Sequence, residues 1–259
     1  MIKPFYRLLI ELTNGRWSSW IIKKFSQSSI SRFIIPSFAR VYSLKQEEME
    51  KGLHEFPTLH DLFIRRLKAG KRKIDSDPNS VVSPVDAVIE DIGVIRETSE
   101  MEVKGKTYSV LDMLGDQDTV RKYLNGSYII LYLSPSHYHR IHSPITGMVN
   151  RQWTLGSKSF PVNKWGLKYG RKTLSKNYRV ITEIKTSSGY VSVVKVGAMF
   201  VNSINVIHEG NKLEKGSEMA YFSFGSTVIL LFEKGIFQLD HSIQIPKEIK
   251  VGEKLGILK

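Results

Sequence analysis

The sequence contains no cysteine in its 259 residues. It can therefore form no disulfide, hold no metal through a thiolate and use no cysteine nucleophile. It also lacks a run of about 20 continuous apolar residues, the length that a membrane-spanning helix needs. The N-terminus has no compact apolar segment followed by a small-residue cleavage site, so we expect no secretory signal. We predict a protein that stays on the cytoplasmic side and at most lies on a membrane.

Acidic residues are scarce relative to basic ones. The chain has 25 Asp and Glu against 38 Lys and Arg, a formal net charge of +13. This charge indicates an anionic partner, either nucleic acid or an anionic membrane surface, although a basic face that only maintains solubility would give the same composition. No basic segment is interleaved with aromatic residues as in an RNA-recognition motif, so nucleic acid is not expected as a partner.

The first 45 residues are basic and amphipathic, with eight Lys and Arg against one acid, Glu11. Four apolar residues have the i, i+3, i+4, i+7 spacing of one helix face, namely Phe5, Leu8, Leu9 and Leu12. A second apolar patch could form from Trp17, Trp20, Ile21 and Phe25. This pattern suits helices lying among lipid headgroups. Helices that pack on the rest of the protein, with solvated charges, would show the same pattern.

Residues 46–80 are expected to continue as helix and then to loosen. Thr58 is a candidate N-cap for a short helix that extends to Leu67. The stretch 65–73 adds six basic residues and no acid, and it could be a second headgroup contact or a solvated turn. We assign residues 1–80 as a basic helical membrane-associating region.

Short apolar runs separated by turn residues dominate from residue 81 onward, which is typical of β-strands. Residues 81–95 indicate a strand, a proline-containing turn and a second strand. The pattern predicts an α+β fold, in which amphipathic N-terminal helices precede a compact, mainly antiparallel β-rich catalytic domain at 81–259. Further strands are expected at 127–133, 179–185, 190–201 and 227–232.

Two segments combine reactive side chains with turns. Ser83-Pro84-Val85-Asp86 places a carboxylate between two strands, where a lone Asp usually caps its own backbone. The segment 134–144, SPSHYHRIHSP, places His137, His139 and His142 directly after a strand, where scaffolds often present chemistry. The spacing could suggest zinc, but no cysteine, HExxH motif or close carboxylate accompanies it. General acid–base chemistry suits the cluster better.

A third segment, Phe224-Gly225-Ser226-Thr227, leads into an apolar strand. It differs from the GxSxG nucleophile elbow, which lies between a strand and a helix. If the Gly225–Ser226 peptide is strained and an imidazole activates the hydroxyl, the serine oxygen can attack the preceding carbonyl. The segment is therefore a candidate for self-cleavage.

Together these segments resemble the phosphatidylserine decarboxylase family in its short bacterial, pyruvoyl-dependent form. The resemblance rests on PVD at 84–86, YHRIHSP at 138–144 and FGST at 224–227. It covers essentially the whole chain, including the amphipathic N-terminus. Further landmarks follow in the family's order: FIRRL at 63–67, KG at 104–105 with Tyr108, LG at 114–115, PVN at 161–163, NYR at 177–179 and VGA at 196–198.

The resemblance implies that the chain is a proenzyme. An aspartate, a histidine and a serine act together in the family's self-cleavage, and by position these are Asp86, His142 and Ser226. His142 would take the proton from Ser226 while Asp86 stabilises the imidazolium, as in a serine-protease triad. Cleavage between Gly225 and Ser226 would give a β chain, 1–225, and an α chain, 226–259. Ser226 would become a covalent pyruvoyl cofactor, whose ketone condenses with an amine and accepts electrons.

The implied activity is that of a carboxy-lyase of phospholipid biosynthesis, which converts phosphatidylserine to phosphatidylethanolamine and CO2. His139 is implied as an acid in this decarboxylation, and neither a metal nor added pyridoxal phosphate is needed. The implied partners are phosphatidylserine, an anionic membrane surface and the heterodimer of the two chains, which could assemble further. The implied location is the cytoplasmic side of the cell membrane, with peripheral attachment.

Two positions depart from the family's pattern. Ala87 stands where many members have glycine, a change that the turn tolerates if the φ angle is negative. His137 stands where some members have Asp, which leaves the protonation network around His139 open. Two other functions also stay open on the residues alone. One is a serine hydrolase that acts on lipid esters through Ser226 and His142, and the other is a non-catalytic membrane-binding module.

Overall fold

The computed structural model describes residues 16–103, 105–158, 173–198, 204–223 and 226–259. Several predicted features lie outside these residues. They are the apolar helix face at 5–12, Lys104 of the KG landmark, the PVN landmark at 161–163, residues 199–201 of the strand predicted over 190–201, and both Phe224 and Gly225.

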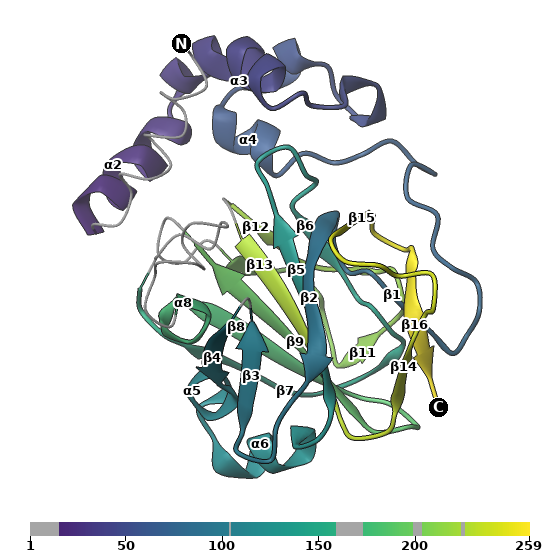
Figure 1. Ribbon diagram of the computed structural model, residues 1–259. Helices are drawn as coiled ribbons and strands as arrows, with labels where there is room; N and C mark the ends of the chain where they lie inside the picture. Colours follow the sequence, from purple (N-terminus) through teal and green to yellow (C-terminus); the bar gives the residue numbers. More distant parts are fainter. Residues whose placement is uncertain (1–15, 104, 159–172, 199–203, 224–225) are drawn as a thin grey trace.

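An antiparallel sheet of eight strands, in the order β11-β7-β8-β9-β13-β5-β2-β15, forms the centre of the molecule (Figure 1). β13 (Ser226–Phe232) lies between β9 (Tyr190–Gly197) and β5 (Ser127–Leu133), and all of its residues are buried. These strands are rich in Val, Ile and aromatic residues, which favour the extended backbone. The other strands of this sheet are β2 (Ala87–Val94), β7 (Gly147–Leu155), β8 (Arg179–Lys185), β11 (Lys212–Leu213) and β15 (Lys247–Ile249).

One face of this sheet packs against two smaller sheets, ordered β1-β16-β14 and β10-β12-β6. Val228 and Leu230 of β13 point into this layer. Because strand side chains alternate between faces, Ser226 points the same way. We call this side the serine face. Its covering strands are β1 (Ser80–Val82), β6 (Arg140–His142), β10 (Ile204–Val206), β12 (Glu218–Phe222), β14 (Phe237–Leu239) and β16 (Lys254–Leu258).

The opposite side of the sheet, which we call the helix face, packs against a hairpin and short helices. Ser109 begins α5 by accepting a hydrogen bond from Asp112 N at 3.0 Å, and Gly115 ends it with a φ of 77°, which glycine adopts without strain. These elements are β3 (Glu100–Val103), β4 (Lys106–Ser109), α5 (Val110–Leu114), α6 (Gln117–Tyr123) and α8 (Thr173–Lys176).

The N-terminal helices form a separate apolar cluster beside the strand ends of β6 and β12 (Figure 1). Thr58 caps the last helix as expected, because its hydroxyl accepts a hydrogen bond from Asp61 N at 3.1 Å. That helix ends at Phe63 instead of Leu67, since Leu67 pairs with Met49 in a β-bridge. The elements are α2 (Arg16–Ser26), η1 (Ser29–Ile34), α3 (Ile35–Val41), η2 (Gln46–Glu48), η3 (Leu53–Glu55) and α4 (Leu59–Phe63).

The predicted α+β class with an antiparallel, β-rich core is confirmed. The strands at 127–133 and 179–185 have the predicted bounds, and β13 begins one residue early, at Ser226. The run predicted over 190–201 ends as a strand at Gly197. Within the described ranges, no helix has both the length and the apolar character to cross a bilayer.

Candidate active site

Ser226 opens β13 at the end of the sheet nearest the N-terminal helices (Figure 1). The strand register places it opposite Leu133 of β5 and Gly197 of β9. The residue is fully buried, and its Oγ has no hydrogen-bond partner among the described residues. Buried polar groups nearly always have partners, so an unpaired hydroxyl calls for a specific explanation. Ser226 therefore presents a hydroxyl that is shielded from water and engaged by no described group.

The loop between β5 and β6, residues 134–139, which we call the histidine loop, follows β5 directly and so begins beside Ser226. His139 is fully buried, and its Nδ1 lies 2.8 Å from the carbonyl oxygen of His137. A carbonyl only accepts, so Nδ1 carries the proton and Nε2 keeps a lone pair. Nε2 has no partner in the part of the chain that the structure describes, and the ring packs on Phe63 at 4.0 Å between centroids. Burial, with a contribution from the charge of Arg65, lowers the pKa of His139 well below its usual value.

His142 ends β6 and has both ring nitrogens engaged. Nδ1 lies 2.7 Å from the carbonyl oxygen of Gly216, and Nε2 lies 3.2 Å from the hydroxyl of Tyr138. The carbonyl fixes the proton on Nδ1, so Nε2 is the acceptor atom. Burial lowers the pKa of His142, while the Gly216 carbonyl and the charges of Glu218 and Asp86 oppose that shift. At neutral pH the ring is a neutral base.

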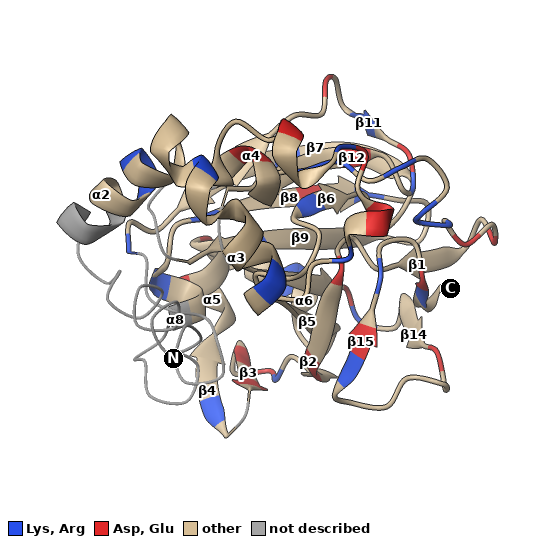
Figure 2. Cartoon of the chain, turned by 90° about the horizontal axis from the view of Figure 1, so that it is seen from above, with Lys and Arg blue, Asp and Glu red and all other residues tan. Residues whose placement is uncertain are grey.

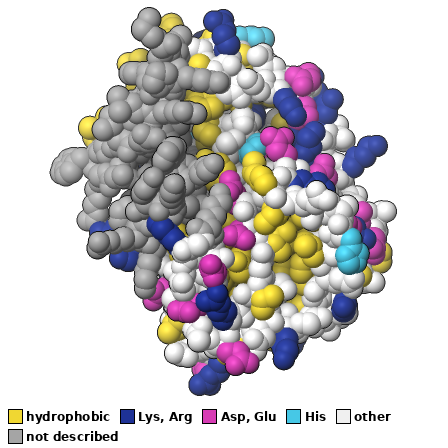
Figure 3. Space-filling model, in the orientation of Figure 1, with side chains coloured by type: hydrophobic (Ala, Val, Ile, Leu, Met, Phe, Trp, Pro, Cys, Tyr) yellow, Lys and Arg dark blue, Asp and Glu magenta, His cyan; other side chains and the backbone are white. Residues whose placement is uncertain are grey.

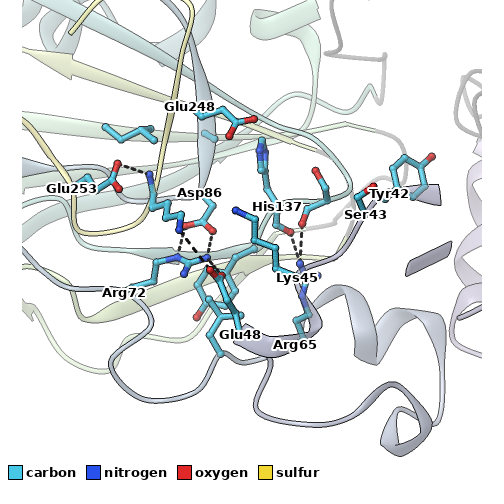
Figure 4. A pocket seen from close by; sticks show the side chains of 16 residues that line it. Tyr42, Ser43, Lys45, Glu48, Arg65, Arg72, Asp86, His137, Glu248 and Glu253 are labelled. Atoms are coloured by element: carbon cyan, nitrogen blue, oxygen red, sulfur yellow. Dashed lines mark hydrogen bonds and ion pairs between the residues drawn. The ribbon is translucent and has the colours of Figure 1, made fainter. Parts of the chain in front are cut away.

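Asp86 lies in the turn between β1 and β2, with its carboxylate buried against Arg72. The Arg72 Nε donates to Oδ1 at 2.8 Å and its terminal nitrogen donates to Oδ2 (Figure 4). Val251 N also donates to Oδ1, at 2.9 Å. Within the described residues, no hydrogen bond joins Asp86 to His142. The two segments nevertheless adjoin, because His142 N donates to Pro84 O at 2.8 Å. The charge of Asp86 is what reaches His142, where it opposes the lowering of the His142 pKa.

The sequence-based alternatives for the basic stretch 65–73 are wrong for two of its members. Arg65 is only 5% exposed and donates to the carbonyl oxygens of Ser136 and His137 at 3.0 and 3.1 Å. Arg72 pairs with Glu48 at 2.8 Å as well as with Asp86. Both arginines thus hold the candidate site instead of facing lipid or water. The other four basic residues are exposed or partly exposed: Arg66, Lys68, Lys71 and Lys73.

Ala87, at the first position that departs from the resembled family's pattern, opens β2 with an extended backbone, so its side chain causes no strain. His137, at the second such position, accepts a hydrogen bond at Nδ1 from Ser134 N at 3.0 Å. Burial lowers the pKa of His137. The neutral ring therefore helps to fix the backbone at the start of the histidine loop.

A cavity of about 410 Å³ adjoins Asp86 and the outer side of the histidine loop (Figure 4). Charges of both signs line it, including Lys45, Glu48, Lys250 and Glu253. Ser226 and His139 are not among its lining residues. The cavity could admit a polar or zwitterionic group beside Asp86. Within the described residues, no three His, Asp or Glu side chains are grouped to hold a metal ion.

The fold brings the four predicted residues to one end of the central sheet. Ser226 starts β13, the histidine loop leaves β5 opposite it, and Phe222 N donates to His139 O at 2.9 Å. The arrangement combines a buried hydroxyl with two neutral imidazoles that each have an acceptor nitrogen. Sequence reasoning missed the roles of Arg65, Arg72 and Tyr138. The available signal was an arginine inside the apolar FIRRL segment and a tyrosine between two histidines.

Comparison with known proteins places these residues in a family. A family model described as phosphatidylserine decarboxylase matches residues 59–257. A phosphatidylserine decarboxylase proenzyme from Geobacillus sp. (strain WCH70) is 61% identical over 259 residues, which cover 100% of both chains. The proenzyme from Anoxybacillus flavithermus (strain DSM 21510 / WK1) is 59% identical over 258 residues, covering 100% of this chain and 97% of the relative. That from Bacillus cereus (strain ATCC 10987 / NRS 248) is 54% identical over 256 residues, covering 99% and 98%.

Proposed function

The chain belongs to the phosphatidylserine decarboxylase family, and we propose that it cuts its own backbone before Ser226 and then converts phosphatidylserine to phosphatidylethanolamine and CO2. It is an enzyme of the decarboxylase class. The observation that carries the proposed self-cleavage is the buried, unpaired hydroxyl of Ser226 at the start of β13, in a chain whose relatives are named proenzymes.

In the proposed cleavage, Ser226 Oγ attacks the carbonyl carbon of residue 225, which lies outside the described residues. His142 accepts the hydroxyl proton at Nε2 once Tyr138 has turned away, and the charge of Asp86 stabilises the resulting imidazolium. His142 then returns the proton to the Ser226 nitrogen as the peptide C–N bond breaks and an ester forms. Elimination then separates residues 1–225 from residues 226–259. The assigned tautomer of His142 supports this role, because it leaves the acceptor nitrogen away from the Gly216 carbonyl.

The Ser226 site fits the pyruvoyl group that the family uses. Conversion of the serine removes the buried, unpaired hydroxyl and turns Cβ into a methyl group, while water replaces the Cα nitrogen, lost as ammonia, with a ketone oxygen. The product is neutral, so the apolar layer has no charge to solvate. When formed, this group supplies a ketone that condenses with the substrate's amine and accepts electrons. His139, with a free Nε2, would hold and return a proton at the site. Arg65 would keep the loop that carries His139 in place.

The proposed α chain, 226–259, would stay bound to the β chain after cleavage. Its first strand, β13, pairs over all seven residues with both β5 and β9. β15 and β16 add further antiparallel ladders to β2 and β1. A strand paired on both edges and buried on both faces cannot leave without unfolding the sheet. This topology supports a non-covalent heterodimer.

The N-terminal helices provide the proposed membrane contact. Five large apolar side chains there are exposed: Trp20 (56%), Ile21 (57%), Phe25 (39%), Ile30 (66%) and Phe33 (85%). Basic side chains on α2 and α3 accompany them (Figure 2). Elsewhere, basic and acidic side chains are interspersed on the right-hand side of the face in Figure 3. Apolar and basic groups on the same helices suit attachment to an anionic membrane, which we expect to be the cytoplasmic side of the cell membrane.

Intact mass measurement under denaturing conditions tests the proposed cleavage. We expect two chains corresponding to 1–225 and 226–259, the second with a blocked N-terminus that reacts with hydroxylamine. A single intact chain that still releases CO2 from phosphatidylserine would refute the pyruvoyl proposal. A single chain that hydrolyses lipid esters would favour a serine hydrolase.

Liposome sedimentation tests the membrane contact separately. We expect binding to anionic vesicles that weakens at high salt, because the charges are exposed and therefore screened. The double variant I30S/F33S should reduce binding, whereas V94S, which removes an apolar side chain exposed on β2, should not. Equal binding to neutral vesicles would show that charge makes no contribution.

A further inference from the structure

Lys195 is a fully buried lysine in β9, and the proposed cleavage as described so far does not use it. Its amine makes one hydrogen bond, donating to Thr182 Oγ1 at 2.6 Å. No Asp or Glu forms an ion pair with it among the described residues. Burying an amine without a counter-charge is costly, and apolar residues would fill the same space at no such cost. The position is therefore a candidate for a chemical role.

The strand register places Lys195 on the serine face, two residues along β9 from the position opposite Ser226. Between β9 and β13, Ser226 lies opposite Gly197, and Val228 lies opposite Lys195. Gly197 has no side chain, so Lys195 is the nearest side chain on this face along the described part of β9. Diagonal neighbours on one face of an antiparallel pair are within reach of long side chains. The lysine stem can therefore bring its amine to Ser226.

The hydrogen bond to Thr182 leaves the amine able to accept a proton. Thr182 Oγ1 donates its single proton to Gln152 Oε1 at 3.0 Å, so it can only accept from Lys195. A neutral amine that donates one proton to Thr182 still has an unused lone pair. Thr182 is the opposite diagonal neighbour, on β8, so rotation about the lysine stem moves the amine from β8 towards β13.

The surroundings favour the neutral amine. Burial lowers the pKa of Lys195 to about 7, and no charged group contributes to that shift. Glu183, the neighbour of Thr182, points to the helix face and pairs with Lys122 at 2.9 Å. Facing Lys195 from β13 are Ser226 and apolar residues. The hydrogen bonds that run from Thr182 to Gln152 end at His208, an exposed residue. The Nε2 of His208 lies 3.1 Å from Gln152 Oε1.

We propose that Lys195 is the base of the elimination step in self-cleavage, an inference that rests on the proposed function. After the ester to Ser226 Oγ has formed, the lysine Nζ accepts the Cα proton of Ser226. The electron pair of that C–H bond forms a Cα–Cβ double bond, and the Cβ–Oγ bond breaks. The segment ending at residue 225 leaves as a carboxylate. The step needs no metal ion and no oxidant.

The test follows self-cleavage of freshly translated chain at several pH values, read on denaturing gels. The unmodified chain should cut faster as the pH rises through about 7, because the neutral amine is the base. K195M should cut about 100-fold to 10,000-fold more slowly, the usual range for loss of a general base. Its uncut chain should hold the ester, so neutral hydroxylamine should split it before Ser226. S226A forms no ester, so its chain should resist hydroxylamine.

The control is K185M, which removes an exposed lysine at the end of β8 and should cut like the unmodified chain. K195M should melt no lower than the unmodified chain, since methionine replaces a buried amine that has no counter-charge with an apolar group. Cleavage of K195M at the unmodified rate would overturn the inference, as would an uncut chain that resists hydroxylamine. A rate independent of pH from about pH 6 to about pH 9 in the unmodified chain would overturn it without any variant. No cleavage of the unmodified chain would instead refute the proposed function.

Discussion

The central sheet buries Glu183 on its helix face and Ser226 and Lys195 on its serine face in opposite ways. On the helix face, Glu183 is 1% exposed and accepts hydrogen bonds from Lys122, Tyr123 and Asn150 at 2.9, 3.0 and 2.6 Å. On the serine face, Ser226 Oγ has no partner within the described residues, and Lys195 has one hydrogen bond and no counter-charge. Both faces are otherwise packed with Val, Ile and Leu.

The difference separates structural from chemical roles. A satisfied polar network adds rigidity and stability in a low-dielectric interior. An unsatisfied group costs stability, and proteins keep such groups mainly where function requires them. We therefore expect substitution of Glu183 to change stability and substitutions of Ser226 and Lys195 to change chemistry.

The largest effect is expected for Ser226→Ala. Without Oγ the chain has no nucleophile, so no cleavage should be detected and decarboxylation should be lost with it. The melting temperature should stay the same or rise, because the change removes a buried hydroxyl without a partner. Denaturing gels and circular dichroism measure the two effects. A cleaved S226A chain would remove the serine from the mechanism.

His142→Ala should slow cleavage by about 100-fold to 10,000-fold, the range expected for loss of a general base. The uncut 259-residue chain should accumulate on denaturing gels. The control is H241A, since His241 is exposed and far along the chain from the histidine loop. Rapid processing of H142A would leave His139, whose Nε2 is unpaired and buried, as the base for the first step.

Glu183→Ala tests the helix face. It leaves Tyr123 and Lys122 without their shared partner, and removing one member of a buried ion pair typically costs about 3–5 kcal/mol. The free energy of unfolding from urea titration should fall by about this amount. Cleavage should proceed at the unmodified rate at temperatures where the variant is folded. A folded E183A chain that fails to cut itself would contradict the purely structural role assigned to Glu183.

The smallest expected effect is a change in acid stability. Burial lowers the pKa values of His137, His139 and His142, so these rings stay neutral in the fold. The unfolded chain binds their protons below a pH of about 6.5, so folding stability is full above that pH and falls as the pH drops. Each neutral ring contributes about 1.4 kcal/mol per pH unit in that window. Urea titrations of H139F at several pH values should show a shallower slope than the unmodified chain, and an equal slope would contradict the buried neutral state.

Local sequence patterns accounted for much of the fold. The run at 127–133 became β5 at its predicted bounds, because the six consecutive apolar and aromatic residues that follow Ser127 suit a strand buried on both faces. Thr58 capped α4 because the hydroxyl and the Asp61 amide lie within one turn of each other. Both depend on residues close in sequence.

The site depended on contacts between distant residues. Nothing near Asp86 in the sequence indicated that Arg72 would bind it, or that Arg65 would hold the histidine loop. The basic stretch 65–73 was predicted as a whole to face either water or lipid. A pattern of charges in the sequence does not indicate which guanidinium group will bind a buried acceptor.

The amino-acid sequence alone determined the β-rich class, the order of the family's motifs and the identity of the candidate residues, since these depend on local periodicity and residue type. Only the tertiary structure decided that Ser226 and Lys195 share one face while Glu183 lies on the other. Strand pairing sets the register, and a shift of one residue would have exchanged the faces.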